Sequence, residues 1–177
     1  CPYCHGYEVR GRPLAVLATG PIAGHQARML RADWSDDVTL FVAGVAGLDE
    51  AGLAEAGIRV DARSLRAIAA TEGGLDLTLS DGSTMPVAAL FLGPRTTIAG
   101  SPADLLRCAL ADGPMGPYVR VGPMAQTSVP GVFAAGDQAR PAPNVNFAVA
   151  DGIQAGSGSH ASLIFPEFIQ PLTTELA

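Results

Sequence analysis

Two cysteines, Cys1 and Cys4, stand at the start of the chain in the sequence Cys-Pro-Tyr-Cys-His, with two residues between them. Thiols at this spacing can close a disulfide, and a local environment that favours the thiolate lets one of them attack. The same spacing followed by a histidine, here His5, is also found where haem is attached covalently, and it supplies half of a zinc site. The pair therefore allows dithiol exchange, haem attachment or zinc binding, or it has no chemical role.

The rest of the sequence favours dithiol exchange. A zinc site needs a second pair of ligands, and none stands at finger spacing; Cys108 with His5, His25 or His160 is a poor substitute. Haem attachment needs export and an axial ligand, whereas the remaining chain has the pattern of a nucleotide-binding fold. We predict a redox-active pair, no metal site, and an inert core thiol at Cys108.

A second candidate site is the glycine-rich turn between a predicted strand and a predicted helix. In the dinucleotide-binding pattern G-x-G-x-x-G/A, the backbone approaches a pyrophosphate at a helix N-terminus. Gly20 and Ala23 stand at the second and third positions of this pattern, but Ala18 replaces the first glycine. After the next strand, residues 42–44 offer neither the acid of an NAD site nor the arginines of an NADP site. Binding of NAD(P)H therefore stays open, with a Rossmann-type unit kept for packing as the alternative.

The most specific stretch is Thr127-Ser-Val-Pro-Gly-Val-Phe-Ala-Ala-Gly136-Asp137. A predicted buried strand delivers Asp137 behind a glycine that allows close backbone approach, and a carboxylate there can accept a hydrogen bond from a sugar-like hydroxyl. The helix predicted to begin near Val145 or Asn146 turns its N-terminal amides toward partial negative charge, such as a flavin carbonyl. We predict a cofactor-binding block, against the alternative of a solvated acid in a turn.

The elements that must position these residues alternate at first between strand and helix. The patterns predict strands over 14–18, 38–42 and 58–60, helices over 22–32 and 48–56, then a β-hairpin over 65–71 and 75–79, and a further strand over 87–92. This order predicts an α/β fold: a Rossmann-like nucleotide-binding domain over residues 1–93, with a parallel sheet and an inserted β-meander.

The composition changes after Gly93, where we place a boundary. The patterns in residues 94–177 predict a helix over 103–110, strands over 118–121 and 132–135, and a long helix from about 145 to 163, followed by a weakly patterned tail. These elements form a second predicted domain.

Composition excludes several classes of partner. Hydrophobic residues make up 48% of the 177 residues and the net charge is −6, so a core can form while nucleic acid and anionic membrane surfaces are poor partners. No apolar run reaches the length of about 18 residues that a membrane-spanning helix needs. A cysteine-poor acidic chain fits the cytoplasm. Because the chain begins with cysteine and not methionine, we interpret it as part of a longer protein.

The cysteine motif and the Thr127–Asp137 phrase together resemble the thioredoxin-reductase-like flavoproteins. In that family a Cys-x-x-Cys opens near the start of the pyridine-nucleotide domain, and T-S-x-P-G-V-F-A-A-G-D closes a split FAD-binding domain. The resemblance covers nearly the whole chain and implies that 94–177 is the C-terminal part of the FAD domain. The ADP-binding glycine motif lies in the family's N-terminal part, so we expect FAD binding to need that part.

The resemblance also implies roles for single residues. Cys4 is expected to face the flavin, and Cys1 to exchange with the substrate. Asp137, preceded by Gly136, is expected to bind the ribityl chain of FAD. The backbones of Asn146 and Phe147 are expected to contact the flavin ring. The family usually dimerises, so a homodimer is expected.

The residue after the second cysteine separates two branches of the family. The reductases proper have an aspartate there, whereas this chain has His5 in a Cys-x-x-Cys-His-Gly-x-Glu motif. That variant is similar to the oxidases that close disulfides in dithiol metabolites such as holomycin and gliotoxin, and a histidine can accept the proton. The missing arginines agree, because an oxidase that delivers electrons to oxygen does not need NADPH; a reductase fed by another donor, such as ferredoxin, would also fit.

We therefore expect a flavin-dependent dithiol–disulfide oxidoreductase, which oxidises small dithiols or reduces disulfides such as that of thioredoxin. The alternative is a non-catalytic or truncated flavoprotein remnant that acts as a binding module. Ala18 favours the remnant, whereas the intact cysteine pair and Gly136-Asp137 favour the enzyme.

Overall fold

The computed structural model describes residues 1–98, 102–165 and 167. The chain divides into two compact units, Cys1–Pro94 and Arg95–Ala177. Each unit has its own hydrophobic core and is described by itself.

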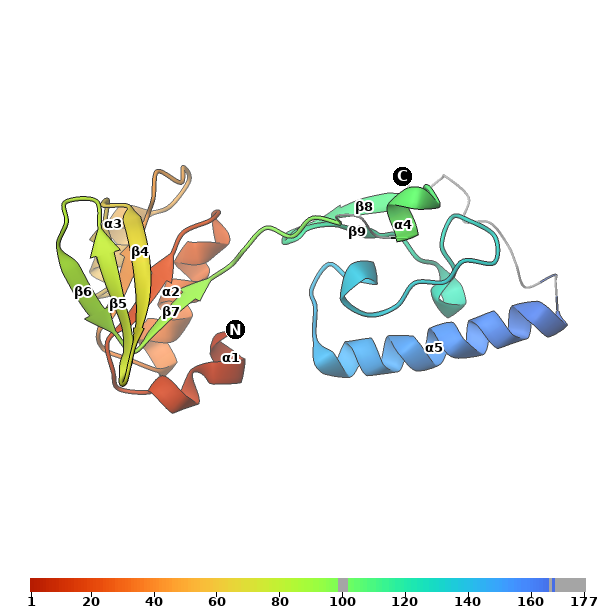
Figure 1. Ribbon diagram of the computed structural model, residues 1–177, viewed down its shortest axis with the longest axis horizontal. Coiled ribbons are helices and arrows are strands. Elements are labelled where there is room, and N and C mark those ends of the chain that lie inside the picture. Colours follow the sequence, from red (N-terminus) through yellow and green to blue (C-terminus); the bar gives the residue numbers. More distant parts are fainter. Residues whose placement is uncertain (99–101, 166, 168–177) are drawn as a thin grey trace. The chain divides into compact units, whose positions relative to one another are not determined.

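The first unit is built on a four-stranded parallel sheet with the order β3-β2-β1-β7 (Figure 1). Its strands are β1 (Leu14–Leu17), β2 (Val38–Phe41), β3 (Arg59–Asp61) and β7 (Ala89–Leu92). The two central strands, β1 and β2, are almost wholly apolar and buried, as expected for a parallel sheet covered on both faces. Leu14 pairs with Val38 on one side and with Ala89 on the other. The predicted α/β class with a parallel sheet is confirmed.

Two helices pack against this sheet. Helix α2 (Ile22–Asp33) buries Ala23, Ala27 and Leu30, which recur at helical spacing and form one apolar face. Helix α3 (Glu50–Glu55) begins at Asp49, whose side chain accepts a hydrogen bond from the Gly52 amide. It is followed by Gly57 in the left-handed conformation, with φ +77°.

The predicted β-meander is a three-stranded antiparallel sheet with the order β4-β5-β6. Its strands are β4 (Leu65–Thr71), β5 (Gly74–Leu79) and β6 (Thr84–Val87). Its apolar face packs with Ala15 and Phe41 of the parallel sheet. The prediction of a single strand over 87–92 is wrong, because Val87 ends β6 and β7 begins at Ala89. Between them the Ala88 amide donates to the carbonyl of Pro13, so the chain leaves one sheet for the other there.

The cysteine motif forms a short helix, α1 (Pro2–His5), and a 3-10 turn, η1 (Tyr7–Val9). Cys1 is the N-cap residue of α1, and Pro2 occupies the first helical position, where its fixed φ and missing N–H suit a helix start. Pro2 and Gly6 are buried, whereas the residues between them are exposed. The two ends of α1 are therefore buried, whereas the residues between them, which include Cys4 and His5, are exposed.

The second unit contains a two-stranded hairpin, short helical turns and one long helix. Its elements are α4 (Pro102–Leu105), β8 (Leu110–Gly113), β9 (Gly116–Val119), η2 (Pro123–Ala125), η3 (Gly136–Ala139) and α5 (Val145–Ile164). The long helix agrees with the prediction for 145–163. Among the described residues, no helix has the length and apolar character to cross a membrane.

Three shorter predictions in this unit are wrong. The helix predicted over 103–110 ends at Leu105, because Arg107 takes a left-handed φ of 56° and Leu110 begins β8. The strand predicted over 118–121 lies two residues earlier, as β9. Residues 132–135 form no strand. Their neighbour is the turn η2, in which Met124 and Ala125 have positive φ, so only the single bridge between Gln126 and Phe133 forms.

Candidate functional site

The predicted redox cysteines lie together on the first turn of α1. The Cys4 amide donates to the Cys1 carbonyl at 3.0 Å, so the two residues stand three apart on one side of a helical turn. Both thiols are free and exposed. Among the described residues, no group of three His, Cys, Asp or Glu side chains could hold a metal ion. The arrangement leaves both sulfurs open to attack and exchange.

His5 and Glu8 share a groove with Cys1. The groove has a volume of about 440 Å³, and its polar side is formed by these three residues, with Nδ1 of His5 4.0 Å from Oε1 of Glu8. Its other side is formed by Val9 and by β7, residues 89–92. Cys4 is not among the lining residues, so the two cysteines differ: Cys1 lines the groove, whereas Cys4 is exposed outside it.

The turn after β1 places Gly20 and Ala23 in different environments. Ala23 is buried in the core, and its amide donates to the Gly20 carbonyl at 3.1 Å, whereas a Cβ built on Gly20 would meet no atom within 4 Å. Ala18, which replaces the first glycine, is also buried in the core. The backbone at Gly20 is therefore open to a ligand, but the flanking residues serve packing.

The end of β2 offers no charged group to a nucleotide. Ala43 and Gly44 form a turn with φ of 48° and 75°. The next acid, Asp49, is used locally, because it caps α3 and lies 3.5 Å from a guanidinium nitrogen of Arg28. These residues fit a nicotinamide nucleotide poorly, since neither the ribose acid nor a phosphate-binding arginine is present at this strand end.

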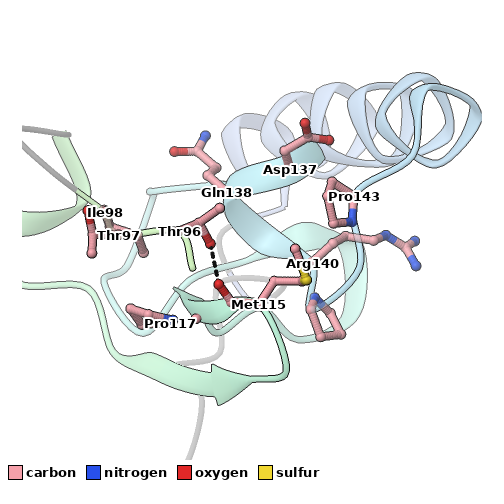
Figure 2. A pocket seen from close by; sticks show the side chains of 11 residues that line it. Thr96, Thr97, Ile98, Met115, Pro117, Asp137, Gln138, Arg140 and Pro143 are labelled. Atoms are coloured by element: carbon pink, nitrogen blue, oxygen red, sulfur yellow. Dashed lines mark hydrogen bonds between the residues drawn. The ribbon is translucent and has the colours of Figure 1, made fainter. Parts of the chain in front are cut away.

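The second candidate site is a cavity of about 330 Å³ in the second unit. Figure 2 shows residues that line it: Asp137 and Gln138 come from η3, and Thr96 and Met115 come from two other segments, from which the Asp137 carboxylate points away. The Thr96 hydroxyl donates to the Met115 carbonyl at 2.9 Å and ties these two segments together. The Asp137 side chain is exposed, so its carboxylate is free to accept hydrogen bonds from a ligand.

Gly136 shapes the turn that carries Asp137. Its φ of +73° lies in the left-handed region, and a Cβ there would stand 3.6 Å from the Cβ of Ala148 on α5. The turn thus lies against the first turns of α5. Asn146 and Phe147 are exposed on α5 and do not line the cavity. The Asn146 amide donates to the side chain of Asn144, which caps the helix.

Two residues that sequence reasoning missed hold this site together. Arg140, which also lines the cavity, donates from Nε and Nη2 to the two carboxylate oxygens of Asp151 at 2.7 and 2.6 Å. Its guanidinium lies 4.8 Å from the centre of the Phe147 ring. The hydrogen bonds from Arg140 hold the pKa of Asp151 below its ordinary value, against the effect of burial, and the Gly136 amide acts in the same direction. The sequence did carry a sign of this pair, because Asp151 is the one acidic residue in the sequence of α5.

The elements that build the two sites are shared with known oxidoreductases. No family model matches the chain. It is 37% identical over 175 residues to "Thioredoxin reductase tcpT" of Claviceps purpurea, covering 93% of this chain and 54% of that protein. It is 35% identical over 175 residues to "Thioredoxin reductase sirT" of Leptosphaeria maculans, covering 89% of this chain and 53% of that protein.

A solved structure, an oxidoreductase from Agrobacterium tumefaciens, matches with a TM-score of 0.80 and 42% identity, over 94% of this chain and 56% of that one. The chain spans about half the length of the curated relatives it matches. In sequence and in fold the chain is thioredoxin-reductase-like, which confirms the resemblance predicted from its motifs. Its relatives are oxidoreductases by name.

Proposed function

We propose that this chain contributes the dithiol site of a flavin-dependent dithiol–disulfide oxidoreductase. The observation that carries the proposal is the placement of Cys1 and Cys4 on α1, with both thiols free and exposed. The relatives named thioredoxin reductase support a redox role for such a pair. The predicted alternative, a binding module without chemistry, gives no reason for two exposed free thiols on one helical turn.

Dithiol exchange at this pair takes two displacements. With Cys1 and Cys4 joined as a disulfide, a thiolate of the substrate attacks the Cys1 sulfur, and the Cys1–Cys4 bond breaks to leave Cys4 as thiolate. The second substrate thiolate then attacks the substrate sulfur bound to Cys1, which forms the substrate disulfide and releases Cys1 as thiolate. Two electrons pass from the substrate to the cysteine pair. The reverse sequence reduces a disulfide.

The groove supports a division of roles between the two cysteines in these displacements. Because Cys1 lines the groove and Cys4 does not, Cys1 is the residue that forms the mixed disulfide. His5, in the same groove, accepts the proton of the attacking substrate thiol. Glu8 lies 4.0 Å from the His5 ring and orients it, since the carboxylate attracts the N–H or the charge that the ring gains.

The residues of the second unit fit part of an FAD site. Asp137 would accept hydrogen bonds from the ribityl hydroxyls, and Gly136 keeps its turn close to α5. Bound FAD would supply the two-electron acceptor that reoxidises the cysteine pair. The Asn146 backbone amide already donates to the side chain of Asn144, and the Phe147 ring lies beside Arg140.

The direction of electron flow that we propose is dithiol oxidation without NADPH. The end of β2 lacks the groups that would bind NADPH, so a nicotinamide donor has no charged anchor there. A groove of about 440 Å³ matches the size of small-molecule sites, which favours a small dithiol over a protein disulfide such as that of thioredoxin. A homodimer and a cytoplasmic location remain predictions from the family and the composition.

The test is an anaerobic titration of flavin absorbance in FAD-loaded protein that carries this chain together with the N-terminal part of the FAD domain, first with dithiothreitol and then with NADPH. We expect the dithiol to bleach the flavin and NADPH to leave it oxidised. The matched control is Cys4→Ser, in which bleaching by the dithiol is lost while FAD stays bound.

The other results contradict the proposal in different ways. Prompt bleaching by NADPH would restore a thioredoxin-reductase role and overturn the reading of Ala18 and of the β2 end. Bleaching by neither reagent, or a protein that takes up no flavin, would leave the non-catalytic remnant.

A further inference from the structure

Trp34, the sole tryptophan of the chain, lies against the end of the dithiol helix. It is the residue directly after α2, and α1 lies beside that helix (Figure 1). A Cβ built on Gly6 would stand 2.6 Å from the Pro2 carbonyl oxygen and 2.7 Å from Cδ2 and Cε2 of the indole, distances that real Cβ atoms do not reach. Only a glycine at position 6 therefore lets the backbone after Cys4 and His5 rest on the indole face.

Trp34 and Ser35 also hold the segment that joins α1 to β1. The Gly11 amide donates to the Trp34 carbonyl at 2.8 Å. The Ser35 hydroxyl, which is buried, donates to the Arg12 carbonyl at 2.6 Å. The connection is thus fixed at its start by the ring on Gly6 and at its end by two hydrogen bonds. We call Trp34 and Ser35 together the clamp.

The indole is placed by packing alone. Its Nε1 is buried and finds no hydrogen-bond partner among the described residues, although a buried tryptophan N–H normally has one. A phenylalanine would avoid that cost. The larger ring of Trp34 covers Gly6 and packs on the core of the first unit.

We propose that Trp34 is a positioning residue for the Cys1–Cys4 pair, an inference that rests on the proposed dithiol function. Cys1 and Cys4 protrude on a four-residue helix, which is too short to be stable by itself. The clamp supplies the rigidity that this helix lacks. By restricting α1 it keeps the two sulfurs near each other and so raises their effective concentration for disulfide closure.

The experiment measures the dithiol–disulfide equilibrium of the pair in the full chain. The protein is equilibrated without oxygen in glutathione buffers of graded ratio, and the fraction of Cys1–Cys4 disulfide is read by alkylation and peptide mass. For Trp34→Phe we expect the equilibrium constant for disulfide formation to fall about fivefold to tenfold, which for a two-electron couple raises the potential by about 20 to 30 mV.

The matched control is Leu48→Ala, which removes apolar packing from the same core at a residue that lies beside Gly24 of α2. It should lower the melting temperature and leave the dithiol equilibrium unchanged. Ser35→Ala, which loses one clamp hydrogen bond, should shift the equilibrium in the same direction as Trp34→Phe. The more drastic variant Trp34→Ala is not required, because Trp34→Phe and Ser35→Ala test the inference even if Trp34→Ala fails to fold.

Three results overturn the inference and can be told apart. If the wild-type disulfide forms and its equilibrium constant is the same in Trp34→Phe and Ser35→Ala, the positioning role of the clamp is refuted and the dithiol function stands. If the wild type forms no Cys1–Cys4 disulfide in any buffer, both the positioning role and the dithiol function are refuted. An equal shift in Leu48→Ala would show that general loosening of the core, and not the clamp, moves the equilibrium.

Discussion

Arg140 and Asp151 form a two-pronged ion pair that joins the Asp137 turn to the long helix α5. The oxygens of Asp151 lie 2.6 and 2.7 Å from two guanidinium nitrogens, and this planar match of two hydrogen bonds is the strongest geometry that such a pair adopts. Arg140 lies three residues after Asp137. The pair therefore fixes the turn that the proposed flavin site depends on.

Replacing the acid of this pair tests its role. Asp151→Asn keeps the shape of the side chain but removes its negative charge, so the side chain at position 151 offers Arg140 at most one oxygen acceptor. We expect the melting temperature to fall by about 3 to 6 °C. In protein that also carries the N-terminal part of the FAD domain, we expect FAD affinity to fall about tenfold, measured by fluorescence quenching of added FAD. An affinity equal to that of wild type would show that the turn holds its conformation without the pair.

Gly136 offers a sharper test, because the chain contains a matched glycine. Gly136→Ala forces an L side chain into a φ of +73° at a cost of about 1 to 2 kcal/mol, while its methyl meets only an ordinary contact with Ala148. Gly131→Ala has the same type of strain, at φ +76°, with open space around the new methyl. The two variants should lose similar stability in urea unfolding.

Only the first of these variants should affect the cofactor. Gly136→Ala displaces the turn before Asp137 and should weaken FAD binding, whereas Gly131→Ala should leave it unchanged. Equal weakening in both would mean that FAD binding follows general stability and that the Asp137 turn has no special place in it.

Acid stability should depend on Arg63 in the first unit. Arg63 donates to Asp61 and to Asp81, and it holds the pKa of both carboxyls below their ordinary values; for Asp81 the Ser83 hydroxyl is the larger cause. Because the folded-state pKa values are depressed, the stabilisation is complete above the unfolded value near pH 4 and is lost as the pH falls through the folded values. Unfolding measured between pH 6 and 2 should show this loss.

The control for this prediction is Arg63→Gln. The variant should be less stable than wild type above about pH 4, and the difference should shrink as the pH falls. Since the side chain of Arg63 is 39% exposed, salt should also reduce the difference. A difference that stays constant down to pH 2 would show that Arg63 acts through packing and not through charge.

Elements that depend on consecutive residues could be predicted from the sequence, whereas features that depend on contacts with distant segments of the chain could not. The β1–α2–β2 succession followed from two apolar runs and one helical face, all within residues 14–41. The cysteine motif could be recognised from the sequence because its residues are consecutive. The apolar run 132–135 looks like a strand, but its neighbour η2 is a turn, and nothing in the run itself reveals that. The β7 wall of the Cys1 groove comes from far along the chain, and only folding brings the two together.

The division of labour between the two thiols is the most direct consequence of that groove. In Cys4→Ser a substrate disulfide can still be attacked by Cys1, but no second thiol resolves the mixed disulfide, so the adduct accumulates. In Cys1→Ser the remaining thiol lies outside the groove, so no stable adduct with a groove-sized disulfide should form.

The measurement is the intact mass of each variant after incubation with a small aromatic disulfide, with the adduct located by peptide mapping. Turnover should fall by at least about 10³-fold in both variants, because the two cysteines act as one unit. Adduct formation on Cys4 in Cys1→Ser at the rate seen on Cys1 in Cys4→Ser would mean that the groove does not select the attacking thiol, and the assignment of Cys1 to the substrate would have to be withdrawn.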